Sequence, residues 1–157
     1  MSDDAGFQES MPEELKLDNQ LCFPLYAASR LVTRLYKDRL EPLGITYPQY
    51  IVLMILWEEA PCPVKTISRR AILNTNTLTP LLKRLEQQGY ISRQRDGQDE
   101  RQVMVHLTLA GRALRDRCAC VPWELLQSSG VSLEKLVALR EMLNEVLPDL
   151  KQTLEGS

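Results

Sequence analysis

The chain has 157 residues, of which 44% are hydrophobic, and a formal net charge of -2. This length and composition support one domain with a hydrophobic core, which oligomerisation can complete. No segment approaches the ~20 consecutive apolar residues that span a bilayer, and the acidic start lacks the basic and apolar parts of a secretory signal. We therefore expect a cytoplasmic protein without a membrane partner.

The charged residues are unevenly distributed along the chain. Residues 1–20 contain six acidic residues and one lysine. Residues 1–16 show no hydrophobic period, and we expect them to form a disordered acidic leader. Residues 65–105, in contrast, contain eight Lys or Arg residues against four acidic ones. A local basic surface of this kind is typical of proteins whose affinity for DNA falls steeply with salt.

Residues 17–157 are expected to form a single, mainly α-helical domain that begins with a long helix. Asp18 or Asn19 is suited to cap the start of this helix, and Pro42 and Gly44 end it. The apolar positions of this helix are Leu21, Leu25, Ala28, Leu31, Val32, Leu35 and Leu40.

Two shorter helices are expected next. The first runs from about Pro48 to Glu59 and is almost entirely apolar in its middle, which is typical of a core element. Prolines at 61 and 63 end it, and residues 64–72 form a short helix that turns into another one near Thr75. These last two helices are a predicted helix-turn-helix.

The helix that opens near Thr75 has one apolar face, because leucines at 78, 81, 82 and 85 follow the i, i+3, i+4, i+7 spacing up to Gly89. Its other faces carry small polar side chains near the start of the helix and cations further along it. Such a face suits entry into a major groove with contacts to phosphates, although a plain solvated face is the alternative. The candidate DNA-binding residues here are Asn76, Thr77, Thr79, Pro80, Lys83 and Arg84.

A charged β-hairpin is predicted after this helix. Residues 90–92 begin one strand, residues 103–107 alternate along a second, and the polar run 95–101 is the exposed tip. This hairpin is a predicted wing. We expect Asp99 to orient Arg101, which would reach into a minor groove, where a narrow A·T-rich sequence deepens the negative potential. The alternative is a surface ion pair worth ~0 to 1 kcal/mol.

Helices are also expected beyond the hairpin. Thr108 is suited to cap a helix that Pro122 interrupts or bends, and Ser132 is suited to cap a last helix to about Leu154. Neither helix closes a core by itself. With the first helix, they favour an isologous dimer interface, which would space two recognition helices by about one DNA turn, ~34 Å.

The hairpin and the first helix resemble a known family. Residues 99–111 fit the pattern DxRxxxVxLTxxG, which resembles the wing of the MarR family of winged helix-turn-helix regulators. Residues 17–48 resemble the start of the organic-hydroperoxide-resistance regulators, the OhrR branch, and the likeness continues through residues 77–85 to Gly111. The resemblance implies a homodimer on pseudo-palindromic operator DNA. The DNA-binding lobe of this chain would span residues 45–107, and dimerisation helices at 17–44 and 108–157 would flank it.

Four cysteines are present, and neither a disulfide framework nor a metal site is expected from them. The chain has no C-x2-C pair, and its single histidine, His106, lies in a predicted strand; no cofactor is implied. Cys62, between two prolines, is expected at the surface. Cys22 lies near the start of the first helix, where the dipole stabilises the thiolate that reacts with peroxides. A buried structural thiol is the alternative.

The resemblance assigns Cys22 a function. In the OhrR branch the peroxidatic cysteine accepts hydrogen bonds from two tyrosines of the partner subunit. Tyr36 and Tyr47 stand at these positions, and Tyr26 matches a further pocket tyrosine. The implied mechanism is oxidation of Cys22 by an organic hydroperoxide, followed by release of the operator. For both tyrosines, filler at a helix interface is the alternative.

The chain departs from the family pattern at the resolving cysteine. The branch places it near Trp123 and Glu124 of this chain, so Cys120, one turn earlier on the same face, is preferred over Cys118, and a small external thiol is a third option. Asn74 and Asn76 also differ from the branch. The alternative function is a MarR-type repressor that responds to a small aromatic or phenolic ligand. A thiol peroxidase is not expected, because a PxxxTxxC signature around Cys22 is absent.

Overall fold

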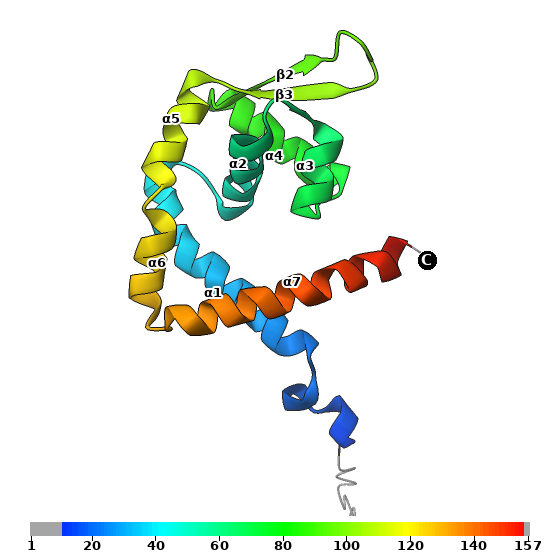
Figure 1. Cartoon of the computed structure of the whole chain (residues 1–157), viewed down its shortest axis with the longest axis vertical. Helices are drawn as coiled ribbons and strands as arrows, with labels where there is room; N and C mark the ends of the chain where they lie inside the picture. Colours follow the sequence, from blue (N-terminus) through cyan, green and yellow to red (C-terminus); the bar gives the residue numbers. More distant parts are fainter. Residues whose placement is uncertain (1–10, 156–157) are drawn as a thin grey trace, which may run out of the picture.

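The computed structural model describes residues 11–155, which form a small helical lobe, short helices along one side of it and two long helices (Figure 1). A β-hairpin projects from the top of the lobe in this view, and α1 and α7 extend away below it. The helices are α1 (Cys22–Leu40), α2 (Tyr47–Glu59), α3 (Val64–Ala71), α4 (Thr75–Gln87), α5 (Leu109–Cys118), α6 (Val121–Ser129) and α7 (Leu133–Glu155). The strands are β1 (Cys62–Pro63), β2 (Ile91–Arg95) and β3 (Val103–Leu107).

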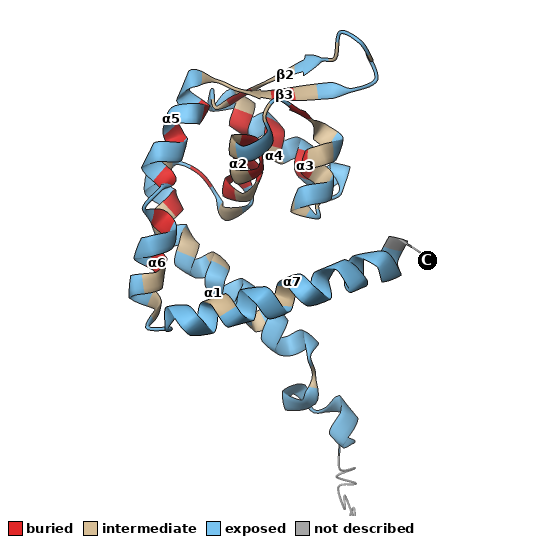
Figure 2. Cartoon of the chain, in the orientation of Figure 1, coloured by how far each residue is buried: buried red, intermediate tan, exposed pale blue. Residues whose placement is uncertain are grey.

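The hydrophobic core lies in the lobe and along its junction with α5 and α6 (Figure 2). Helix α2 crosses the centre, as its apolar middle predicts, and begins with a capping box in which Thr46 and Gln49 hydrogen-bond reciprocally. Each fully buried leucine or isoleucine contributes about 1.5 to 3 kcal/mol. Core side chains with almost no exposed surface are Leu40, Val52, Leu53, Leu56, Ile67, Leu78, Leu82, Leu85, Val105 and Leu114.

The wing belongs to a three-stranded antiparallel sheet of order β1-β3-β2, whereas the sequence predicts only the β2–β3 hairpin. The third strand, β1, pairs Cys62 with Val105. The expectation of a surface Cys62 is therefore wrong, because its side chain is only 4% exposed. Flanking prolines favour extended backbone, and this places the segment against β3 at the sheet edge.

Helix α1 begins later than predicted. Residues 17–19 form a 3-10 helix, and α1 starts at Cys22 without a side-chain cap. Neither Asp18 nor Asn19 caps it, and the Asn19 amide donates instead to the Glu13 carbonyl at 2.8 Å. Of the predicted leader, residues 1–10 lie outside the described residues, and Glu13–Leu15 forms a short 3-10 helix.

The LTxxG part of the wing motif joins the wing to α5. The Thr108 hydroxyl caps α5 by accepting from the Gly111 amide at 3.0 Å, and it donates to the Gly89 carbonyl at 2.6 Å. A Cβ at Gly111 would lie 2.0 Å from the Tyr90 carbonyl oxygen, so only glycine fits. Both residues of the motif are therefore structural.

The two long helices, α1 and α7, are exposed over much of their length (Figure 2), and many of their exposed residues are apolar. No helix of the described part of the chain is long and apolar enough to cross a membrane. Faces of this extent are typical of subunit interfaces. The exposed apolar residues are Phe23, Leu25, Tyr26, Leu31, Val32 and Leu35 on α1, and Leu133, Leu136, Leu139, Met142, Val146, Leu147, Leu150 and Leu154 on α7.

Candidate functional site

Helix α4 presents the polar face that its sequence predicts. The Asn74 side chain caps the helix by accepting from the Thr77 amide at 2.9 Å, and three leucines of the apolar stripe are buried. The Thr79 hydroxyl donates to the Thr75 carbonyl at 2.8 Å, so its oxygen remains available as an acceptor. All six candidate DNA-binding residues of this helix are exposed: Asn76, Thr77, Thr79, Pro80, Lys83 and Arg84.

The wing tip is organised by Asp99, but not through an ion pair. One Asp99 oxygen accepts from the backbone amide of Arg101 at 3.1 Å, and the other accepts from the Gln102 side chain at 3.1 Å. Within residues 11–155 the Arg101 guanidinium has no acidic partner. Asp99 thus shapes the turn and leaves the cation of Arg101 open to a phosphate or a groove.

Two of the eight cations in residues 65–105 form ion pairs within the described part of the chain. Arg93 of β2 binds Glu86 of α4 through its guanidinium at 2.7 Å and 3.1 Å and through its backbone amide at 3.0 Å. These bonds lower the pKa of the Glu86 carboxyl. Arg70 of α3 likewise binds Glu58 and Glu59 at 2.8 Å and 2.6 Å. The first pair fixes the wing to the recognition helix.

Cys22 and Tyr36, two of the candidate redox residues, lie near opposite ends of α1. Cys22 is exposed as the first residue of the helix, and Tyr26, one turn further, is 61% exposed. Tyr36 lies 14 residues after Cys22 in the same helix, which corresponds to roughly 21 Å at the usual rise per residue. Cys22 therefore cannot touch Tyr36 of its own chain.

Tyr36 and Tyr47 form a pair. Their ring centroids are 4.8 Å apart, and both rings are partly buried against the core. Burial raises the pKa of both phenols. Each hydroxyl therefore stays protonated around neutral pH and can donate a hydrogen bond to an anion.

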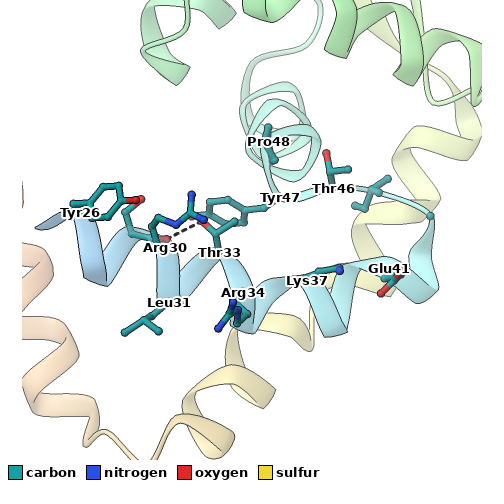
Figure 3. Close-up of a pocket in the computed structure, with 13 residues that line it drawn as sticks. Tyr26, Arg30, Leu31, Thr33, Arg34, Lys37, Glu41, Thr46, Tyr47 and Pro48 are labelled. Carbon is teal, nitrogen blue, oxygen red and sulfur yellow. Dashed lines mark hydrogen bonds between the residues drawn. The ribbon is translucent and has the colours of Figure 1, made fainter. Parts of the chain in front are cut away.

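A cavity of about 890 Å³ lies beside this pair, between α1 and the segment that leads into α2. Figure 3 shows Tyr26, Arg30 and Thr33 on the side of α1 that faces Tyr47, and Leu31 on the opposite side. The Arg30 guanidinium lies 5.8 Å from the Tyr26 ring centroid, within cation-π range. The lining of the cavity therefore combines aromatic rings, from Tyr26 and Tyr47, with the positive charge of Arg30.

The two candidate resolving cysteines differ in exposure. Cys118 is 2% exposed, and burial raises its pKa. Cys120 is exposed, and a hydrogen bond with Glu124 is the main cause of its raised pKa. Glu124 also binds Arg39 of α1 at 3.3 Å, which places this region about 17 residues, roughly 25 Å, along α1 from Cys22. A disulfide within one chain would need a large rearrangement.

Several of these contacts involve residues that the sequence analysis did not single out. Glu86 and Arg39 carry no motif, and their partners lie on other elements. The same holds for Trp57, whose indole donates to the Gly111 carbonyl at 2.9 Å. The only available signal for Trp57 was its place in an apolar helix. No group of His, Cys, Asp and Glu residues within the described part of the chain has the arrangement of a metal site.

A helix-turn-helix with an exposed polar recognition helix and a projecting charged wing defines a winged helix-turn-helix DNA-binding protein. Comparisons with known proteins agree. The family model described as transcriptional regulator SarA/Rot matches residues 34–118. The organic hydroperoxide resistance transcriptional regulator of Bacillus subtilis (strain 168) is 44% identical over 144 residues, covering 92% of this chain and 98% of that regulator.

Solved structures extend the comparison. AbfR of Staphylococcus epidermidis is 38% identical, with a TM-score of 0.74 over 89% of this chain and 97% of that one. Reduced AbfR bound to DNA is 40% identical, with a TM-score of 0.70 over 88% and 96%. Its disulfide form is 38% identical, with a TM-score of 0.58 over 86% and 95%.

The chain belongs to the MarR family of winged helix-turn-helix transcriptional regulators, in the organic-hydroperoxide-resistance branch. Regulators of this family are dimers. The predicted family, fold class and regulatory function are therefore confirmed. The individual site residues remain predictions.

Proposed function

We propose that this regulator is a cytoplasmic homodimeric repressor that binds operator DNA and releases it when an organic hydroperoxide oxidises Cys22. Two α4 helices, with Thr77, Thr79, Lys83 and Arg84 on their exposed faces, enter successive major grooves. Each wing places Arg101 against the adjacent minor groove. Regulators are not enzymes, and we assign Cys22 to a single oxidation per signal rather than to turnover.

The separation along α1 carries this proposal. Cys22 and Tyr36 are roughly 21 Å apart within one chain. Both lie on a helix whose apolar face is exposed and needs a partner. A two-fold arrangement that places the start of one α1 beside the end of the other brings Cys22 to the Tyr36 and Tyr47 phenols of the second subunit. The dimer then builds two equivalent sites, each shared between chains.

The hydroperoxide is the oxidant of the reaction at this shared site. The Cys22 thiolate attacks the terminal peroxide oxygen, the O–O bond breaks, and the alkoxide leaves as an alcohol after it takes a proton. Cys22 becomes a sulfenic acid. The Cys120 thiol of the second subunit can then displace hydroxide, which leaves as water, and a disulfide forms. The tyrosine hydrogen bonds to the thiolate are lost in the first step.

Oxidation must change DNA binding strongly to derepress a gene. A shift from nearly full to nearly empty operator occupancy needs about 5 kcal/mol of differential binding. A covalent bond between subunits that replaces hydrogen bonds and packing at the dimer interface is of sufficient magnitude. AbfR has been solved in reduced, overoxidised and disulfide forms, the first two on DNA, and this supports control through a cysteine.

Replacement of the sensor thiol tests the proposal. Cys22→Ser protein should bind operator duplex as tightly as wild type and keep it after stoichiometric cumene hydroperoxide. Cys62→Ser, which alters a buried thiol of the sheet, should release the duplex as wild type does. Release by Cys22→Ser protein with Cys118 and Cys120 intact would reject Cys22 as the sensor. Mass spectrometry under non-reducing conditions would identify the cysteine that pairs with Cys22.

The cavity beside α1 favours a second candidate function. Its volume of about 890 Å³ and its lining by Tyr26, Tyr47 and Arg30 suit a small aromatic or phenolic ligand. In this alternative Cys22 forms only part of the interface, and the ligand controls DNA release. The two candidate functions differ in how DNA binding is recovered. If a ligand controls release, the ligand should release Cys22→Ser protein from DNA, and removal of the ligand by dialysis should restore DNA binding without a reductant.

A further inference from the structure

A row of aromatic rings leads away from the tyrosine pair. The centroid of Tyr36 lies 4.8 Å from that of Tyr47 and 5.7 Å from that of Tyr50, and the Tyr50 centroid lies 6.1 Å from that of Trp57. These spacings fall within the range of favourable ring contacts. Tyr47, Tyr50 and Trp57 all belong to α2, and only Tyr36 comes from α1. The row therefore follows α2 through the core of the lobe.

The far end of this row is hydrogen-bonded to the base of the wing. The Trp57 indole donates to the Gly111 carbonyl at 2.9 Å. Gly111 packs so closely on Tyr90 that a Cβ would meet its carbonyl oxygen, which also accepts from the Thr108 amide at 3.1 Å. Tyr90 lies between Gly89, just beyond the end of α4, and the first residue of β2. Trp57 thus reaches the point where recognition helix, wing and α5 meet.

The middle of the row is rigidly held. Tyr50 is 3% exposed, and burial, with smaller effects of neighbouring Tyr36 and Cys118, raises its pKa to about 12. Its proton is therefore retained at physiological pH. A close-packed interior has few voids to absorb the displacement of a ring, so a shift of Tyr36 obliges its neighbours to repack.

We propose that Tyr50 and Trp57 are positioning residues that couple the Tyr36–Tyr47 pair to the wing base. The coupling rests on the proposed function, because the change at the pair is the loss of its hydrogen bonds to Cys22 of the second subunit. Tyr36 then moves against Tyr50, Tyr50 against Trp57, and the indole displaces the Gly111 carbonyl. The lobe that carries the wing and α4 then shifts relative to α5, and operator contact is lost.

The first test compares duplex affinity before and after oxidation. The measured quantity is the release ratio, which is the Kd for operator DNA after treatment with stoichiometric cumene hydroperoxide divided by the Kd before treatment. Trp57→Phe keeps a ring but removes the indole donor. We expect it to change the reduced-state Kd by less than about threefold and to lower the release ratio by about tenfold, within the usual range of allosteric couplings. A release ratio equal to that of wild type would overturn the proposal.

Variants at Tyr50 distinguish the effect of losing the ring contact from the effect of a folding defect. Tyr50→Phe keeps the ring and should release DNA as wild type does, whereas Tyr50→Leu breaks the row and should release poorly although it binds. Equal release by Tyr50→Phe and Tyr50→Leu would contradict a role for the ring. Circular dichroism of each reduced protein confirms that the comparison is between folded forms.

A second test needs no peroxide and therefore does not depend on the sensor assignment. Tyr36→Leu should accelerate deuterium exchange at the Thr108 amide, which bonds to Tyr90, by about tenfold in the wild-type background. With Trp57→Phe present, the added acceleration should fall below about twofold. Equal acceleration in both backgrounds would reject the coupling. Peroxide release by Cys22→Ser protein would instead reject the sensor and leave this exchange result to decide the coupling.

Discussion

At the scale of single residues, the wing motif divides into positions with a structural role and positions that we propose contact DNA. Thr108 and Gly111 fasten the wing to α5 through a cap and a close backbone approach. Asp99 shapes the tip, and Arg101 is left with an open guanidinium. The structure therefore shows which residues of the family pattern support the fold, and the DNA contact of Arg101 is a prediction.

Gly111→Ala tests the structural part. The new Cβ would lie 2.0 Å from the Tyr90 carbonyl oxygen. Backbone must shift, and we expect the free energy of unfolding to fall by about 2 to 4 kcal/mol in urea denaturation. Gly97→Ala is the matched control, because no atom lies within 4 Å of its added Cβ. A loss equal to that of Gly97→Ala would contradict the close approach.

Arg101→Ala tests the DNA-contacting part. Loss of an unpaired cation that reaches DNA should weaken operator binding by about 1 to 2 kcal/mol, or about five- to thirtyfold, without lowering stability. The salt dependence of Kd, measured by fluorescence anisotropy, should become shallower. Arg115→Ala is a suitable control, because Arg115 is exposed on α5 and, among residues 11–155, forms an ion pair with its neighbour Asp116 alone. Unchanged affinity and salt slope for Arg101→Ala would exclude the wing contact.

At the scale of elements, the Glu86–Arg93 pair holds the wing against α4. Two guanidinium nitrogens of Arg93 donate to Glu86 Oε2, and the Arg93 backbone amide donates to Glu86 Oε1. Because the folded-state pKa of Glu86 is lowered, its contribution is present above the ordinary carboxyl pKa and is lost as pH falls through the folded value. The wing is thus tied to the recognition helix at neutral pH.

Glu86→Gln measures this tie. The pair is partly exposed, so solvent screening limits the expected loss of unfolding free energy to about 0.5 to 1 kcal/mol at pH 7. The difference from wild type should shrink toward zero as the pH falls through the lowered folded-state pKa of Glu86, because the wild-type carboxyl then becomes protonated as well. A difference that stays constant between pH 7 and pH 3 would assign the loss to packing. Glu100→Gln at the exposed tip is the control.

Most elements could be predicted from sequence because their signals are local. The leucine period of α4, the Thr108 cap and the alternation of β3 each depend on neighbours within a few residues. The two-residue strand at Cys62 could not be predicted, because its partner Val105 is far along the chain. The start of α1 was also placed too early, because the Asn19 side chain binds Glu13 rather than the helix end.

At the scale of the whole molecule, the regulator requires its second subunit. Apolar residues of α1 and α7 remain exposed in the single chain, and the candidate redox residues are too far apart to meet within it. Tyr36 and Tyr47 were found in sequence only by resemblance to the family. The structure brings these two rings together, and it adds Tyr50 and Trp57, whose part in the row depends on tertiary packing.

A charge on the exposed face of α7 tests the subunit interface. Leu139→Glu should shift the protein from dimer to monomer in sedimentation velocity, because burial of an unpaired carboxylate costs several kcal/mol. Operator affinity should fall with it, since one chain carries one recognition helix. Arg140→Glu, at the next position on the same helix, changes charge without removing an apolar side chain. A Leu139→Glu dimer would place the interface elsewhere.

Mixed dimers test the shared redox site most directly. Neither the Cys22→Ser homodimer nor the Tyr36→Phe/Tyr47→Phe homodimer has a complete site, and each should release operator poorly after cumene hydroperoxide. A heterodimer of the two chains rebuilds one complete site only if the thiol and the phenols come from different subunits. We therefore expect this heterodimer to regain hydroperoxide-dependent release. A heterodimer that responds no better than either homodimer would contradict it.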